Sequence, residues 1–206
     1  MSKNTCRDSK CCGSCDGQNL QEIVDSYKKN RRDNYHCYHN EFKKHAKWST
    51  AADAESLILG KHPNHPEVNT HQRRLYKRAR RQFASALVEN RSRIGKAKDF
   101  DSLINTLAMA AGSGIGSLAI YDTALRIGKA LNLRPKNVYL HAGPLVSAKH
   151  LKLKIHCEYV NKIAIRKLRD PYEHPEFQSM KEEEIEDLLC VCKSAILNLQ
   201  PIRSYG

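Results

Sequence analysis

The chain has 206 residues, with 35 Lys and Arg against 22 Asp and Glu, which gives a formal net charge of +13. A chain of this length can bury one compact core, and a strong positive charge attracts polyanions such as nucleic acids. No apolar run approaches the roughly 20 residues that a membrane helix needs, and the polar start of the chain lacks the apolar segment of a secretory signal. We therefore expect a cytoplasmic protein that does not enter a membrane.

Residues 1–19 form a cysteine-rich tail with four closely spaced thiols, Cys6, Cys11, Cys12 and Cys15. Thiolates at this spacing can converge on one tetrahedral metal ion, and zinc fits better than an iron–sulfur cluster because adjacent cysteines are not a usual cluster signature. A second half-site can come from His36, Cys37 and His39. The alternatives are a disordered tail and disulfides, which a reducing cytoplasm disfavours.

Apolar residues at helical spacing predict an all-α fold in which residues 20–206 form one compact domain. Helices are expected over 20–32 and 51–59, and one or two over 145–168, where local alternation leaves a short strand as the alternative. A last helix is predicted from a capping box of Ser179 and Glu182. Its first turn is acidic, which suits the positive end of the helix dipole.

Between His71 and Ile94 the apolar residues gather on one side of a predicted amphipathic helix. The other side carries six cations, Arg73, Arg74, Lys77, Arg78, Arg80 and Arg81. No acidic residue is interleaved with them, so they repel one another unless an anion lies against them. The pattern favours a surface that binds nucleic-acid phosphates, with an ordinary solvated face as the alternative.

The stretch from 100 to 131 predicts a helical hairpin. An apolar-periodic helix, capped by Asp99 or Asp101, ends at a turn that contains Gly114, Ile115 and Gly116. A second helix follows at once and is expected to stop at Asn132. Two glycines allow a phosphate to approach the main chain closely, and the start of the second helix offers unpaired N–H groups. The turn is therefore a candidate phosphate site, although glycines also serve plain tight turns.

The sequence AGSGIGSLAIYDTALRIGKALNLRPKNVYLHAG (111–143) resembles the hairpin and following helix of the helix-hairpin-helix DNA glycosylases. The resemblance implies that Gly114, Ile115 and Gly116 bind a phosphate of DNA. In that family a short loop then delivers a catalytic aspartate. Here the corresponding residues, Val138 to His141, contain no carboxylate, and Gly112-Ser113 stands where the family has Leu-Pro.

Two residues are candidates for chemistry. His141 ends an apolar run. The unperturbed pKa of a histidine side chain, about 6.5, suits a general base or a phosphate ligand, and His141 can equally orient its loop by hydrogen bonding. Asp122 is four residues before Arg126, a spacing that favours a structural ion pair.

Together these features predict a nucleic-acid-binding protein, with double-stranded DNA as its first candidate partner. The alternatives are a divergent DNA glycosylase or lyase and an adaptor whose basic helix binds an acidic protein, and whether the chain is an enzyme stays open.

Overall fold

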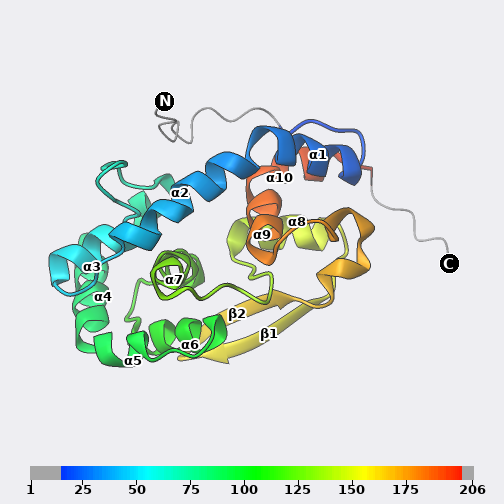
Figure 1. Cartoon of the computed structure of the whole chain (residues 1–206). Coiled ribbons are helices and arrows are strands. Elements are labelled where there is room, and N and C mark those ends of the chain that lie inside the picture. The colour runs from blue at the N-terminus through cyan, green and yellow to red at the C-terminus, as the bar shows by residue number, and fades with distance from the viewer. Residues whose placement is uncertain (1–14, 201–206) are drawn as a thin grey trace. The chain divides into compact units, whose positions relative to one another are not determined.

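The structure is a computed structural model that describes residues 15–200. Within this range it is mainly helical, with ten α-helices, three short 3-10 helices and one two-stranded sheet (Figure 1). The predicted predominance of helix is confirmed, and the short strand that the sequence left as an alternative is present as a β-hairpin. No helix in the described part of the chain is both long and apolar enough to cross a membrane.

The helices are α1 (Leu20–Asn30), α2 (Arg32–His45), α3 (Ala51–Ile58), α4 (Lys77–Glu89), α5 (Arg91–Gly95), α6 (Phe100–Ala110), α7 (Ser117–Leu131), α8 (Ala142–His150), α9 (Glu182–Val191) and α10 (Lys193–Asn198). The strands are β1 (Ile155–Val160) and β2 (Ile163–Leu168), and the 3-10 helices are η1 (Thr70–Arg74), η2 (Pro171–Glu173) and η3 (Pro175–Phe177).

By its internal contacts the chain forms two compact units. Unit 1 contains residues 15–38, 137–158 and 165–200, and unit 2 contains residues 39–136 and 159–164. The chain passes between them within α2, between residues 136 and 137, and twice within the β-hairpin. The sequence predicts one domain over 20–206. Local periodicity does not show which distant segments pack together, so it could not indicate a division into these two units.

The core of unit 1 is formed by α1, α8, α9 and α10. Ile23 and Val24 of α1 are fully buried, as are Ile185, Leu188 and Leu189 of α9. A disulfide joins Cys15 to Cys192, which lie 177 positions apart in the sequence. The two ends of the described chain are thus tied to the same core.

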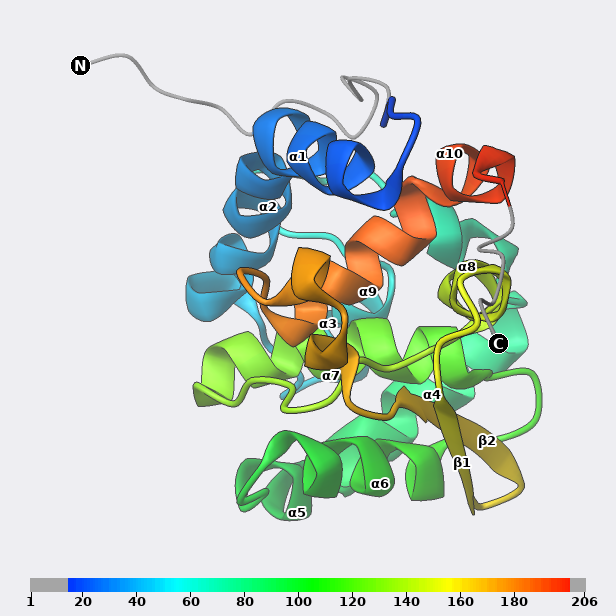
Figure 2. The ribbon, with the colours of Figure 1, turned by 90° about the vertical axis from the view of Figure 1, so that its right-hand side faces the viewer.

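In unit 2, α3 packs against α4 and α7, and α6 also packs against α4 and α7 (Figure 2). Its core includes Phe83 and Leu87 of α4, together with Leu103 and Leu107 of α6. Asp99 caps α6 by accepting a hydrogen bond from the Ser102 amide at 2.7 Å, as predicted. Asn132 ends α7 in the left-handed conformation, with φ 57°, which confirms the predicted stop.

The structure corrects two predictions about where helices begin. The basic helix expected over 71–94 is three pieces, η1, α4 and α5, because Tyr76 is extended (φ −59°, ψ 135°) and α4 begins only at Lys77. The predicted capping box of Ser179 and Glu182 is wrong. The cap residue of α9 is Lys181, whose amide donates to Glu184, whereas the Ser179 hydroxyl accepts from Lys28.

Candidate functional site

The glycine turn of unit 2 leads directly into α7. Gly116 is the N-cap of that helix and provides no side chain to the first amides of α7. Gly114 has φ +87°, a conformation that favours glycine, and Ile115 is tucked inward with 5% of its surface exposed. Gly114 and Gly116 are both exposed. The turn therefore presents backbone amides to solvent at the positive end of a helix.

Asn161 fixes the end of the helix that precedes this turn. Its side-chain amide donates to the carbonyls of Ala108, Met109 and Ala111 at 3.2, 3.4 and 3.3 Å. These are carbonyls at the end of α6 and just beyond it. The hairpin tip, where Asn161 and Lys162 both have positive φ, thus holds the chain at the point where it enters the glycine turn.

Helix α4 lies directly against the glycine turn. A Cβ atom at Gly114 would lie 3.0 Å from the Cβ of Ala79 in α4. This close contact requires both residues to be small. It brings the basic segment and the glycine turn, predicted separately as phosphate sites, next to each other within unit 2 (Figure 2).

The cations of this region fall into two groups. The exposed ones are Arg73, Arg74, Lys77, Arg78 and Arg81, and in the described part of the chain none of their side chains forms a hydrogen bond or ion pair. We call these five residues the basic surface. Arg80 is different, because its Nε donates to Glu55 at 2.6 Å. Its predicted role as a phosphate contact is therefore replaced by a structural ion pair.

Asp122 and Arg126 form the predicted i,i+4 ion pair, with 3.5 Å between Arg126 Nη2 and Asp122 Oδ2. Arg126 is buried and donates from Nη1 to the carbonyls of Leu57 and Ile58 at 3.1 and 2.9 Å, which satisfies the end of α3. Asp122 also accepts from Gln72 of η1 at 2.5 Å. These contacts give Asp122 a structural role: it anchors η1, which carries Arg73 and Arg74, on α7.

The second group of chemically active residues lies in unit 1 and is formed around His141. Val138 and Leu140 pair with the backbone of β2, through bonds to Leu168 and Arg166, and this pairing delivers His141 to the start of α8. His141 Nε2 lies 2.5 Å from Glu186 Oε1, and both side chains are buried. A ligand atom of Cys190, one turn along α9, lies within 4.8 Å of ligand atoms of both.

The acidic residues of α9 are buried or half-buried, and Glu184 and Asp187 have partners within unit 1. Glu184 Oε1 lies 2.5 Å from His36 Nε2, and Asp187 accepts from the Tyr27 hydroxyl at 3.0 Å. Burial disfavours the charge of Glu184, but the hydrogen bonds from His36 and the Lys181 amide outweigh it and lower the pKa of this carboxyl. Burial, together with Asp187, raises the pKa of Tyr27 far above its ordinary range. Glu184 and Asp187 therefore serve the fold of unit 1.

Most of the cysteine and histidine residues that the sequence predicts as metal ligands have other contacts in the structure. Cys15 is in the disulfide with Cys192, Cys37 is also disulfide-bonded, and His36 pairs with Glu184. His39 is buried in α2 of unit 2. Cys6, Cys11 and Cys12 lie outside the described residues. For Cys15 and Cys37, the prediction of thiolate ligands is thus replaced by disulfides.

Across residues 15–200, one group of three or more His, Cys, Asp or Glu side chains has all its ligand atoms within 4.8 Å of one another. Its members are His141, Glu186 and Cys190. His141 is a candidate from the sequence alone, whereas its partners Glu186 and Cys190 are not. Glu186 and Cys190 are four residues apart on a helix, which places them on one face. This spacing is the one feature of the sequence that indicates a paired carboxylate and thiol. Nothing in the sequence connects that face to His141, which lies 45 positions before Glu186.

No family model matches the chain, and neither a curated protein nor a solved structure matches it.

Proposed function

We propose that this protein binds nucleic acid, with double-stranded DNA as its preferred form, through the glycine turn and the basic surface of unit 2. The observation that carries the proposal is the contact between Gly114 and Ala79, which places the turn against the helix that bears Lys77, Arg78 and Arg81. Exposed amides and unpaired cations are the two kinds of donor that proteins direct at phosphates.

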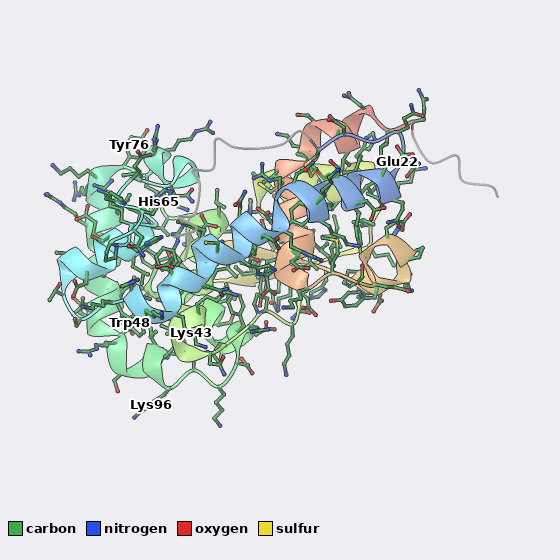
Figure 3. All side chains as sticks on the ribbon, turned by 45° about the horizontal axis from the view of Figure 1, so that its top comes forward. Glu22, Lys43, Trp48, His65, Tyr76 and Lys96 are labelled. Atoms are coloured by element: carbon green, nitrogen blue, oxygen red, sulfur yellow. A yellow bond between two sulfur atoms is a disulfide. The ribbon has the colours of Figure 1, made fainter. Side chains whose placement is uncertain are left out.

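The binding mode is independent of base sequence. The amides at the start of α7 hold one phosphate, and the cations hold others along the backbone. Each neutralised phosphate releases counterions, so affinity falls steeply with salt. Tyr76, labelled in Figure 3, is 80% exposed and lies between the cations of η1 and α4 in the sequence. An aromatic ring in this place can stack on an unpaired base, which offers a test of the preferred form.

The first experiment measures affinity for a fluorescent duplex by anisotropy over a range of salt concentrations. In the triple variant Lys77→Gln, Arg78→Gln and Arg81→Gln, binding should weaken and the slope of log affinity against log salt should fall by about 0.9 per lost contact. The matched control removes the same charge elsewhere in unit 2, at the exposed Lys43, Lys44 and Lys47. The proposal fails if both triple variants behave alike.

The second experiment tests the glycine turn at Gly116, where an added Cβ meets no atom within 4 Å. Gly116→Asp gives α7 a cap that occupies its free amides and puts a negative charge where the phosphate would lie. Binding should weaken, while thermal stability should rise slightly. Gly116→Ser supplies a neutral cap and should weaken binding less. Equal duplex affinity in Gly116→Asp and wild type would exclude the turn as a phosphate site.

Tyr76→Ala distinguishes the two forms of DNA. If the protein prefers duplex, this variant should bind the duplex as wild type does. Tighter binding of a single strand by wild type, weakened in Tyr76→Ala, would overturn the preference for duplex and leave the phosphate contacts in place.

A further inference from the structure

The group formed by His141, Glu186 and Cys190 in unit 1 is unrelated to the phosphate chemistry of unit 2. Its three donors come from two segments that pack together, the start of α8 and one face of α9. Their ligand atoms all lie within 4.8 Å of one another. His141 and Glu186 are buried, and Cys190 is half-buried.

The chemistry of the donors selects the ligand. An imidazole nitrogen, a carboxylate oxygen and a thiolate form the donor set that zinc takes in proteins, whereas calcium and magnesium prefer oxygen alone. Cys190 is not in a disulfide, so its sulfur can act as a thiolate. Three protein ligands leave the fourth position of a tetrahedral ion to water or to another donor.

Space at the thiol comes from Gly143. A Cβ at this position would lie 3.2 Å from the Sγ of Cys190, so any larger residue would crowd the sulfur. The glycine follows His141 by two residues in the first turn of α8. The loop that supplies the imidazole therefore also leaves room beside the thiol.

We propose that His141, Glu186 and Cys190 bind one zinc ion. In the structure His141 and Glu186 share a hydrogen bond of 2.5 Å, and the ion would replace its proton. By the usual bond lengths two ligand atoms on tetrahedral zinc lie roughly 3.3 Å apart, so binding requires a side-chain shift of about 1 Å. Binding also releases the thiol proton of Cys190.

The test uses the full chain, loaded with zinc and passed through gel filtration, with metal content measured by mass spectrometry. Wild type should retain about one zinc per chain at this site. Cys190→Ser and Glu186→Gln should each lose it. Cys157→Ser removes the exposed thiol of β1 and should retain it. A variant with serine at Cys6, Cys11 and Cys12 should also retain it, which separates this site from metal held by the tail. Cobalt in place of zinc should give thiolate-to-metal absorption that Cys190→Ser abolishes.

A second measurement does not depend on a variant that folds. Zinc should slow alkylation of Cys190 in wild type, measured by peptide mapping, and should not change the alkylation of Cys157. The proposal is overturned if folded wild type takes up neither zinc nor cobalt at Cys190, if Cys190→Ser and Glu186→Gln keep the metal, or if zinc leaves the alkylation rate of Cys190 unchanged.

Discussion

The acidic helix α9 of unit 1 and the basic helix α4 of unit 2 carry dense charge of opposite sign. In α9, Glu183, Glu184 and Glu186 are buried, and His36 and His141 pair with two of them. In α4, Lys77, Arg78 and Arg81 are exposed and have no partner within residues 15–200. A run of like charge in a sequence can thus be an internal part of the fold or a surface available to a ligand. The contacts, not the composition, distinguish the two.

The comparison predicts that buried charge is needed for stability and exposed charge is not. The buried cation of unit 2 provides the strongest test. Arg126→Leu removes the donors that satisfy the Leu57 and Ile58 carbonyls and leaves Asp122 without its ion pair. We expect a loss of about 3 kcal/mol in the free energy of unfolding, measured with urea. An unchanged urea midpoint would show that the end of α3 does not depend on this side chain.

A second test concerns the acids of α9. Glu184→Ala removes the bond to His36 and the bond from the Lys181 amide, so we expect a loss of about 2 kcal/mol. Glu173→Ala breaks the exposed pair with Lys154 and is the control, for which we expect no resolvable change in urea. If the two variants were equally stable, the acids of α9 would be no more important to the fold than surface charge.

The third test uses pH. Burial lowers the pKa of His62 below its ordinary 6.5, and His65, His45 and Arg126 add to this effect while Glu41 opposes it. The unfolded chain therefore takes up this proton at a higher pH than the folded chain does. Stability should fall as pH drops below 6.5 and level off below the folded pKa.

Thermal unfolding between pH 7.5 and 5 measures this dependence. His62→Gln should flatten it, since the side chain no longer titrates. His156→Gln, at an exposed position of β1, is the control and should follow the wild-type profile. A profile of His62→Gln as steep as that of wild type would contradict the assignment.

Features that a few neighbouring residues encode could be predicted from the sequence. The cap at Asp99, the stop at Asn132 and the ion pair of Asp122 with Arg126 are of this kind. The contacts that position the candidate sites join distant segments: Gln72 to Asp122, and Asn161 to the end of α6. The zinc group likewise depends on a strand-like pairing that brings His141 to α9. Periodicity and caps contain no information about such pairings, so the sequence could predict the glycine turn but not its neighbours.

The smallest expected effect on stability is the most informative about the basic surface. Lys77 and Arg78 lie in the first turn of α4, which has no acidic residue, so their charges face the positive end of the helix dipole. Lys77 and Arg81 are also a like-charged i,i+4 pair. The local electrostatics of the helix therefore disfavour the very residues that we assign to phosphate binding.

Lys77→Gln, Arg78→Gln and Arg81→Gln together should accordingly raise the free energy of unfolding by a few tenths of a kcal/mol at low salt, and high salt should remove the gain. Duplex binding should weaken in the same protein. The variant should thus gain stability and lose duplex affinity. These opposite changes matter, because cations that stabilised the fold would need no ligand to explain their presence. A loss of more than about 0.5 kcal/mol would show that these side chains support α4 itself, and the contrast with α9 would then disappear.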